Sequence, residues 1–90
     1  MLNPQWLRTF AALIEQGNFT RCAEHLDLTQ AAVSQHVLKL EERLGPLLIR
    51  RPRQLELTPA GRALVSYCEE VGAADQRLYQ RLSEHDDKHG

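Results

Sequence analysis

Gln30 and Gln35 carry the side chains of this 90-residue sequence that are best suited to reading a nucleobase. A glutamine amide offers an acceptor and a donor side by side, and adenine presents the matching pair at N6 and N7 in the major groove. Ala31, close by, suits the methyl group of thymine. Neighbouring polar side chains suit phosphate oxygens, which set register without reading sequence: Thr29, Ser34 and Lys39. The alternative is that these side chains simply solvate the outer face of a helix.

A basic segment lies further along the chain. Residues 46–62 contain four arginines and one glutamate, although the net charge of the whole chain is −1. Three arginines fall at the tip of a predicted hairpin: Arg50, Arg51 and Arg53. Because side chains alternate along a strand, Arg51 and Arg53 are expected to share one face, which leaves Arg50 to point elsewhere. Phosphate or minor-groove contact is the interpretation favoured here, and an ordinary solvated charge cluster is the alternative.

Three helices are predicted to position the glutamines. Apolar residues recur at three- and four-residue spacing, and each segment follows a residue suited to cap a helix. The predicted helices span residues 3–16, 18–26 and 29–44, with Asn3, Asn18 and Thr29 as N-caps. Only Asp27 and Leu28 remain for the second turn, so the second and third helices should cross steeply, as in a helix-turn-helix at about 18–44. This turn aims the start of the third helix outward.

The chain then changes to the short alternating pattern of a β-hairpin, at about residues 46–57. The predicted fold class is therefore mainly α: a winged helix-turn-helix of three helices and a short hairpin wing over residues 1–58. A long helix over residues 59–83 follows, since Thr58-Pro59 repeats the cap-then-proline start. Residues 84–90 are polar and are expected to form a flexible tail.

The long helix is predicted to pair two copies of the chain. Its apolar residues alternate spacings of four and three, which is typical of a helix that packs against another helix. The predicted dimer interface consists of Leu64, Tyr67, Val71, Ala74 and Leu78. Gly72 within the helix costs about 1 kcal/mol relative to alanine, which partner packing must offset. For Tyr67 two roles stay open: stacking across the dimer interface, or covering helices of its own domain.

Composition argues against other classes of function. The sequence shows no nucleophile-base pair, phosphate loop or metal-ligand pattern, so neither an enzyme nor a cofactor or metal is expected. Cys22 and Cys68 are too few and too far apart for a disulfide framework and are expected to be reduced. No apolar run approaches the roughly 18 residues of a membrane span, and the start lacks a signal peptide. A cytoplasmic protein without membrane contact is expected.

From about Leu7 to Leu82 the sequence resembles the N-terminal region of LysR-type transcriptional regulators. The resemblance rests on several motifs in a fixed order: Leu7-x-x-Phe10, Phe19-Thr20-x-Cys22-Ala23-x-x-Leu26, Leu28-Thr29-Gln30-x-Ala32-Val33-Ser34, Leu40-Glu41-x-x-Leu44-Gly45, Leu48-x-x-Arg51 and Leu57-Thr58-Pro59-Ala60-Gly61. Three departures accompany it. Cys22 and Ile49 replace a frequent alanine and phenylalanine, and the wing between Arg51 and Leu57 is one residue shorter than usual and contains Pro52.

The resemblance implies double-stranded DNA as the partner, with the third helix in the major groove and the wing on backbone and minor groove. It also implies a homodimer on an imperfect palindrome, with tetramers possible in a full-length protein. A separate domain for a small-molecule effector normally follows in this family and is absent from this chain, which suggests a truncated protein. The alternative is a winged-helix module that dimerises and binds protein, which the near-neutral charge and shortened wing favour.

Overall fold

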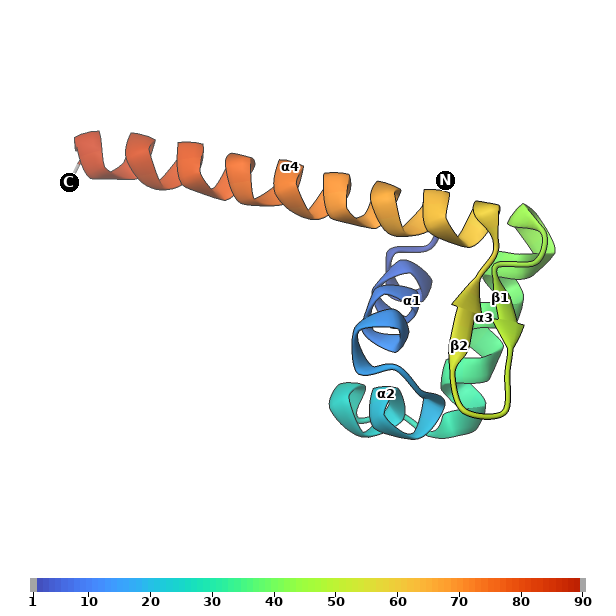
Figure 1. The fold of residues 1–90 in the computed structure, drawn as a ribbon. Helices are drawn as coiled ribbons and strands as arrows, with labels where there is room; N and C mark the ends of the chain where they lie inside the picture. Colours follow the sequence, from blue (N-terminus) through green and yellow to red (C-terminus); the bar gives the residue numbers. More distant parts are fainter. Residues whose placement is uncertain (1, 90) are drawn as a thin grey trace.

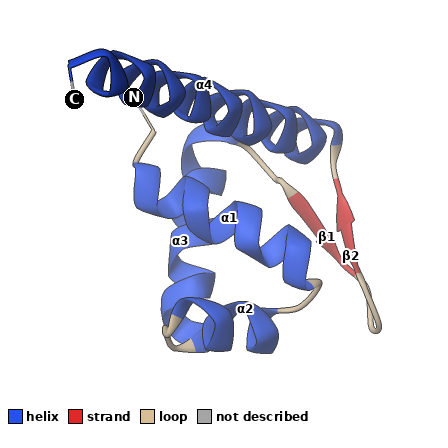
Figure 2. Ribbon diagram, turned by 90° about the vertical axis from the view of Figure 1, so that its left-hand side faces the viewer, coloured by secondary structure: helices blue, strands red, loops and turns tan. Residues whose placement is uncertain are grey.

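The computed structural model describes the backbone of residues 2–89 and the side chains of residues 2–84. It consists of four helices and one antiparallel hairpin, which confirms the predicted fold class. The elements are α1 (Pro4–Gln16), α2 (Phe19–Leu26), α3 (Gln30–Leu44), β1 (Leu48–Arg50), β2 (Leu55–Leu57) and α4 (Pro59–His89). The first three helices form one cluster, the hairpin flanks it, and α4 crosses above both (Figure 2).

Each of the first three helices begins directly after the residue predicted to cap it. Side-chain oxygens of Asn3, Asn18 and Thr29 accept hydrogen bonds from backbone N–H groups of the first turn, at 2.8, 2.8 and 3.0 Å. These bonds satisfy donors that have no partner within the helix. Between α2 and α3, Asp27 adopts the left-handed conformation with φ of 57°. The chain therefore reverses within the predicted two-residue turn.

Two apolar clusters form the core. The first joins α1, α2 and α3 through Ala12, Leu13, Cys22, Ala23, Val33 and Val37. The second joins α1 and α3 to the wing and α4 through Phe10, Leu40, Leu47 and Leu64. Burial of these side chains is the main force that holds the wing and the first turns of α4 against the helices.

The wing is a tight hairpin. Its strands pair in the register Leu48 with Leu57, Ile49 with Glu56 and Arg50 with Leu55. The amide of Arg51 donates to the carbonyl of Gln54 at 3.0 Å and closes the loop. Leu47, which directly precedes β1, is buried in the core, and its carbonyl accepts the amide of Thr58.

Helix α4 starts at the predicted Thr58-Pro59 pair and projects far beyond the rest of the molecule (Figure 1). The Thr58 hydroxyl accepts from the amide of Gly61 at 3.0 Å and donates to the carbonyl of Pro46 at 2.7 Å. The helix continues to His89, whereas the sequence predicted an end at residue 83 and a flexible tail over 84–90. No proline or glycine interrupts residues 83–89, so nothing local stops it. Gly90 lies outside the described residues.

None of the helices in residues 2–89 combines the length and the apolar character required to cross a membrane.

Candidate nucleic-acid interface

The outer face of α3 carries the predicted base-reading side chains. Gln30, Ala31 and Gln35 are all exposed, and neither the wing nor α4 covers them. The opposite face of the same helix is fully buried, with Val33, Val37 and Leu40 in the core. The steep α2–α3 arrangement therefore presents the first turns of α3 to the surroundings, as a helix that enters a DNA groove requires.

Gln30, the first residue of α3, is held by a contact that the sequence did not predict. Its Nε2 donates a hydrogen bond to the hydroxyl oxygen of Thr20 at 3.0 Å. Thr20 is the second residue of α2 and is also exposed. The pairing depends on how the two helices cross, and a repeating pattern within one helix carries no signal for it.

The three predicted phosphate ligands at α3 differ in their burial and in the contacts that they already make. The Thr29 hydroxyl accepts the amide of Ala32 as the helix cap. Ser34 is half-buried on the helix flank. The ammonium of Lys39 lies 3.9 Å from the Glu42 carboxylate, and both side chains are largely exposed. Such a surface ion pair contributes about 0 to 1 kcal/mol, so Lys39 can leave Glu42 at little cost for a stronger anion.

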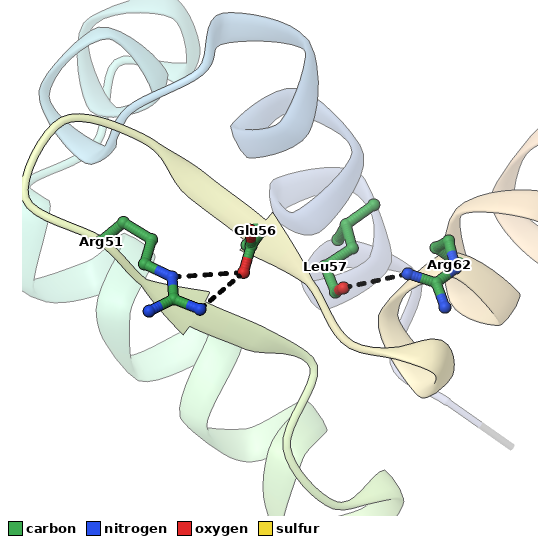
Figure 3. Close-up of polar contacts among 4 residues, drawn as sticks. All are labelled: Arg51, Glu56, Leu57 and Arg62. Atoms are coloured by element: carbon green, nitrogen blue, oxygen red, sulfur yellow. Dashed lines mark hydrogen bonds and ion pairs between the residues drawn. The ribbon is translucent and has the colours of Figure 1, made fainter.

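The three wing arginines lie in three different environments. The Arg51 guanidinium donates from Nε and Nη2 to the same carboxylate oxygen of Glu56, at 3.2 and 3.1 Å (Figure 3). Arg50 stacks over the ring of Phe19, with 4.7 Å between its guanidinium carbon and the ring centroid. Arg53, exposed in the loop at the tip, lines a hollow beside Arg62. Arg62 itself donates to the carbonyl of Leu57 at 3.2 Å.

The Arg51–Glu56 pair follows from strand register. Ile49 lies opposite Glu56, which makes Glu56 a diagonal neighbour of Arg51 on the facing strand. This pair was not predicted from the sequence. Glu56 therefore neutralises part of the charge of Arg51, whereas Arg53 is exposed in the loop at the tip of the wing.

Two side chains of α3 point toward the protein and connect this helix to the wing and to α1. An oxygen of Glu41 accepts the amides of Leu47 at 2.8 Å and Leu48 at 3.4 Å, which joins α3 to the start of the wing. Nδ1 of His36 lies 2.7 Å from the hydroxyl of Thr9. The Thr9 hydroxyl also lies 3.0 Å from the carbonyl of Gln5, and the imidazole tautomer decides which group donates between Thr9 and His36. His36 therefore links α3 to α1.

The predicted dimer residues fall into two groups. Tyr67, Val71, Ala74 and Leu78 are exposed on α4. Leu64 is only 5% exposed and packs with Phe10, Leu40 and Leu47 in the core of its own chain. Near its first turns, the apolar seam of α4 faces its own domain, so the prediction for Leu64 is replaced by a core role. Tyr67, 42% exposed, lines a hollow with Leu44 and Leu64 and has surface left for a partner.

Both cysteines are free thiols. Burial raises the pKa of the Cys22 thiol, and burial together with the nearby Glu69 carboxylate raises the pKa of Cys68. Cys22 lies in the core, and Cys68, a residue of α4, is half-buried against α1. A raised pKa keeps a thiol protonated near neutral pH and therefore poorly nucleophilic.

The arrangement of α1 to α3 with the hairpin defines a winged helix-turn-helix protein. Residues 4–62 match the model of the family described as bacterial regulatory helix-turn-helix protein, lysR family. The chain belongs to this family. The match covers α1, α2, α3, the wing and the start of α4, so it includes every predicted DNA-contacting residue.

Known relatives and solved structures agree with this assignment. The chain is 42% identical over 81 residues to the uncharacterized regulator YxjO of Bacillus subtilis, and 41% identical over 81 residues to the SDS degradation transcriptional activation protein of a Pseudomonas species. These matches cover 89% of this chain but only 28% and 26% of the two relatives, so the chain spans about a quarter of their length. The named relatives are regulators of transcription, and enzymes are not among them.

Two solved structures share the fold over nearly the whole chain. Full-length LysG from Corynebacterium glutamicum superimposes with a TM-score of 0.85 at 29% identity, covering 94% of this chain and 30% of that one. The BenM DNA-binding domain in complex with catB site 1 DNA superimposes with a TM-score of 0.82 at 29% identity, covering 96% and 94%. The second likeness concerns a domain of nearly the same extent bound to DNA.

Proposed function

We propose that this chain binds double-stranded DNA sequence-specifically, as the promoter-recognising part of a dimeric LysR-type transcription regulator that acts in the cytoplasm. The observation that carries the proposal is the exposure of Gln30 and Gln35 on the first turns of α3, directly after the tight turn from α2. The BenM complex supports it, because a domain of the same fold and extent binds DNA there.

In this proposal α3 lies in the major groove. Gln30 and Gln35 present donor and acceptor pairs to base edges, and Ala31 meets a thymine methyl. Phosphates bind at the N-terminus of α3 near Thr29, where amides and the helix dipole favour anions, and at Ser34 and Lys39 along its flanks. These phosphate contacts fix the register of the helix in the groove, while the side-chain amides of Gln30 and Gln35 read the base sequence.

The wing adds contacts that do not depend on sequence. Arg53 is exposed at its tip, and the exposed pair of Arg51 with Glu56 can open toward a phosphate at a cost of no more than about 1 kcal/mol. Arg50 remains on Phe19 and holds β1 against α2. The wing therefore supplies phosphate or minor-groove contacts chiefly through Arg53, with Arg51 second.

Two copies pair through the exposed seam of α4, which consists of Tyr67, Val71, Ala74 and Leu78. A two-fold dimer places two α3 helices on successive half-sites, so its operator is an imperfect palindrome. A tetramer, or control by a small effector molecule, requires regions beyond this chain. The long projection of α4 from the domain leaves this seam accessible to a second copy.

The test begins by selecting duplexes from a random pool with the purified chain. Affinity is then measured for a selected duplex and a scrambled one over a range of salt concentrations. Gln30→Ala and Gln35→Ala should each cost about 1–3 kcal/mol on the selected duplex and much less on the scrambled one. Gln76→Ala, the same change at an exposed position of α4, is the matched control and should alter neither. Selection that enriches no sequence contradicts the proposal.

A protein-binding module is the second candidate, and the wing favours it. Arg51 is paired with Glu56 and Arg50 is stacked on Phe19, so Arg53 is the wing arginine without such a contact among the described side chains, on a chain of net charge −1. A mobility shift against random duplex at low salt separates the candidates, because a DNA reader retains weak nonspecific binding that falls steeply with salt. A protein-binding module need not show any.

A further inference from the structure

We infer that Thr20 is a positioning residue that sets which edge of the Gln30 amide faces a base, and thereby sets the base preference of α3. The inference rests on the proposed DNA-binding function and adds a residue outside the recognition helix. It starts from one contact, the hydrogen bond from Gln30 Nε2 to the Thr20 hydroxyl oxygen at 3.0 Å.

The Thr20 hydroxyl oxygen is available to accept a hydrogen bond from Gln30 because it does not cap α2. Asn18 caps α2 by accepting the amide of Arg21 at 2.8 Å. Thr20 follows as the second residue of the helix, at the end of α2 that lies beside the start of α3. The residue is exposed, so its hydroxyl serves neither the core nor the helix start.

The contact removes an ambiguity that every glutamine amide has. The amide carries one carbonyl oxygen and two N–H donors, and rotation of its last torsion exchanges their positions. When Thr20 accepts one N–H, the oxygen and the other N–H remain. This pair matches adenine, whose N6 donates and whose N7 accepts. An amide released from Thr20 can rotate and direct both N–H groups at O6 and N7 of guanine.

Loss of the Thr20 hydroxyl should therefore relax base preference while leaving the helix in place. A net hydrogen bond of this kind contributes about 0.5–1.5 kcal/mol, which corresponds to a two- to twelvefold change in an equilibrium constant. We expect Thr20→Val, which has nearly the same shape without the hydroxyl, to reduce the discrimination between adenine and guanine by about that factor. Thr20→Ser, which keeps the hydroxyl, should preserve it.

The experiment uses the full chain and duplexes that differ at single base pairs of a selected site. Gln30→Ala first identifies the base pair that Gln30 reads, and the adenine-to-guanine affinity ratio is then measured there. The ratio should fall in Thr20→Val, stay in Thr20→Ser, and show no further effect of Thr20→Val when Gln30→Ala is present. In a Gln35→Ala background, which serves as the matched control, the effect of Thr20→Val should be undiminished.

Each other outcome has a definite meaning. Wild-type protein that prefers no sequence overturns the proposed function and this inference together. Selective wild-type protein with an unchanged ratio in Thr20→Val overturns the inference alone. The inference is also overturned if Gln30→Ala leaves the adenine-to-guanine affinity ratio unchanged. It is overturned as well if Thr20→Val lowers this ratio equally in the presence and in the absence of the Gln30 side chain. Thr20→Ala replaces Thr20→Val if the latter unfolds, and the side-chain amide resonance of Gln30 in the free protein should shift in either variant.

Discussion

The Glu41 carboxylate accepts the amide of Leu47 at 2.8 Å, across the junction between α3 and the wing. The same oxygen lies 3.4 Å from the amide of Leu48. Leu47 is fully buried, so water cannot easily replace the carboxylate. This side chain therefore fixes the angle at which the wing leaves the recognition helix.

Removing that carboxylate should destabilise the domain. Glu41→Ala leaves a buried N–H without its acceptor, and we expect it to lower the free energy of unfolding by about 1–3 kcal/mol in urea denaturation. Glu41→Gln keeps an acceptor and should cost less. Glu42→Ala is the control, because Glu42 makes only an exposed ion pair with Lys39. Equal stability of Glu41→Ala and Glu42→Ala would show that the junction does not depend on Glu41.

Two glycines of α4 should respond to alanine in opposite directions. A Cβ at Gly61 would overlap the carbonyl oxygen of Leu47 and lie 3.0 Å from Cδ2 of Leu57. Gly61→Ala should therefore cost about 1–3 kcal/mol of stability through overpacking. At Gly72 a Cβ meets no heavy atom within 4 Å, so Gly72→Ala should stabilise the helix by up to about 1 kcal/mol. Thermal unfolding of both variants tests the close packing of α4 on the wing.

Neutralising Glu56 should strengthen binding to every duplex. Glu56→Gln releases Arg51 from its ion pair and removes a negative charge from the wing. One additional phosphate contact would steepen the dependence of log affinity on log salt by about 0.9. Titrations at several salt concentrations measure both effects. Arg51→Gln should weaken binding. In a protein that already carries Arg51→Gln, Glu56→Gln should increase the affinity for DNA by less than it does in the wild-type protein. Unchanged affinity and slope in Glu56→Gln would remove Arg51 from the interface.

Charges on the exposed seam of α4 should separate the proposed dimer without unfolding the domain. Leu78, 53% exposed, and Val71 contribute little to the core, so Leu78→Glu and Val71→Glu should shift sedimentation toward monomer while thermal unfolding changes little. Gln76→Glu adds the same charge away from the seam and is the control. Leu64→Ala should behave differently and lower stability by about 2–5 kcal/mol, because Leu64 belongs to the core. A wild-type chain that sediments as a monomer would refute the α4 interface.

The sequence by itself determined the elements and the outward face of α3. Caps at Asn3, Asn18 and Thr29 act within one helical turn, and the apolar spacing of Val33, Val37 and Leu40 settles which side of α3 is buried. Both signals are local, so they can be read without knowing how the helices pack. For the same reason the exposure of Gln30 and Gln35 was predictable.

Only the tertiary structure decided the partners of these side chains. Arg51 meets Glu56 because of strand register, Gln30 meets Thr20 because α2 and α3 cross steeply, and Leu64 enters the core because α4 lies over α1 and the wing. Each contact joins residues whose proximity depends on the packing of whole elements. The helix α4 is also longer than the sequence predicted. A polar segment without helix breakers is equally compatible with a flexible tail and with the continuous helix that extends to His89.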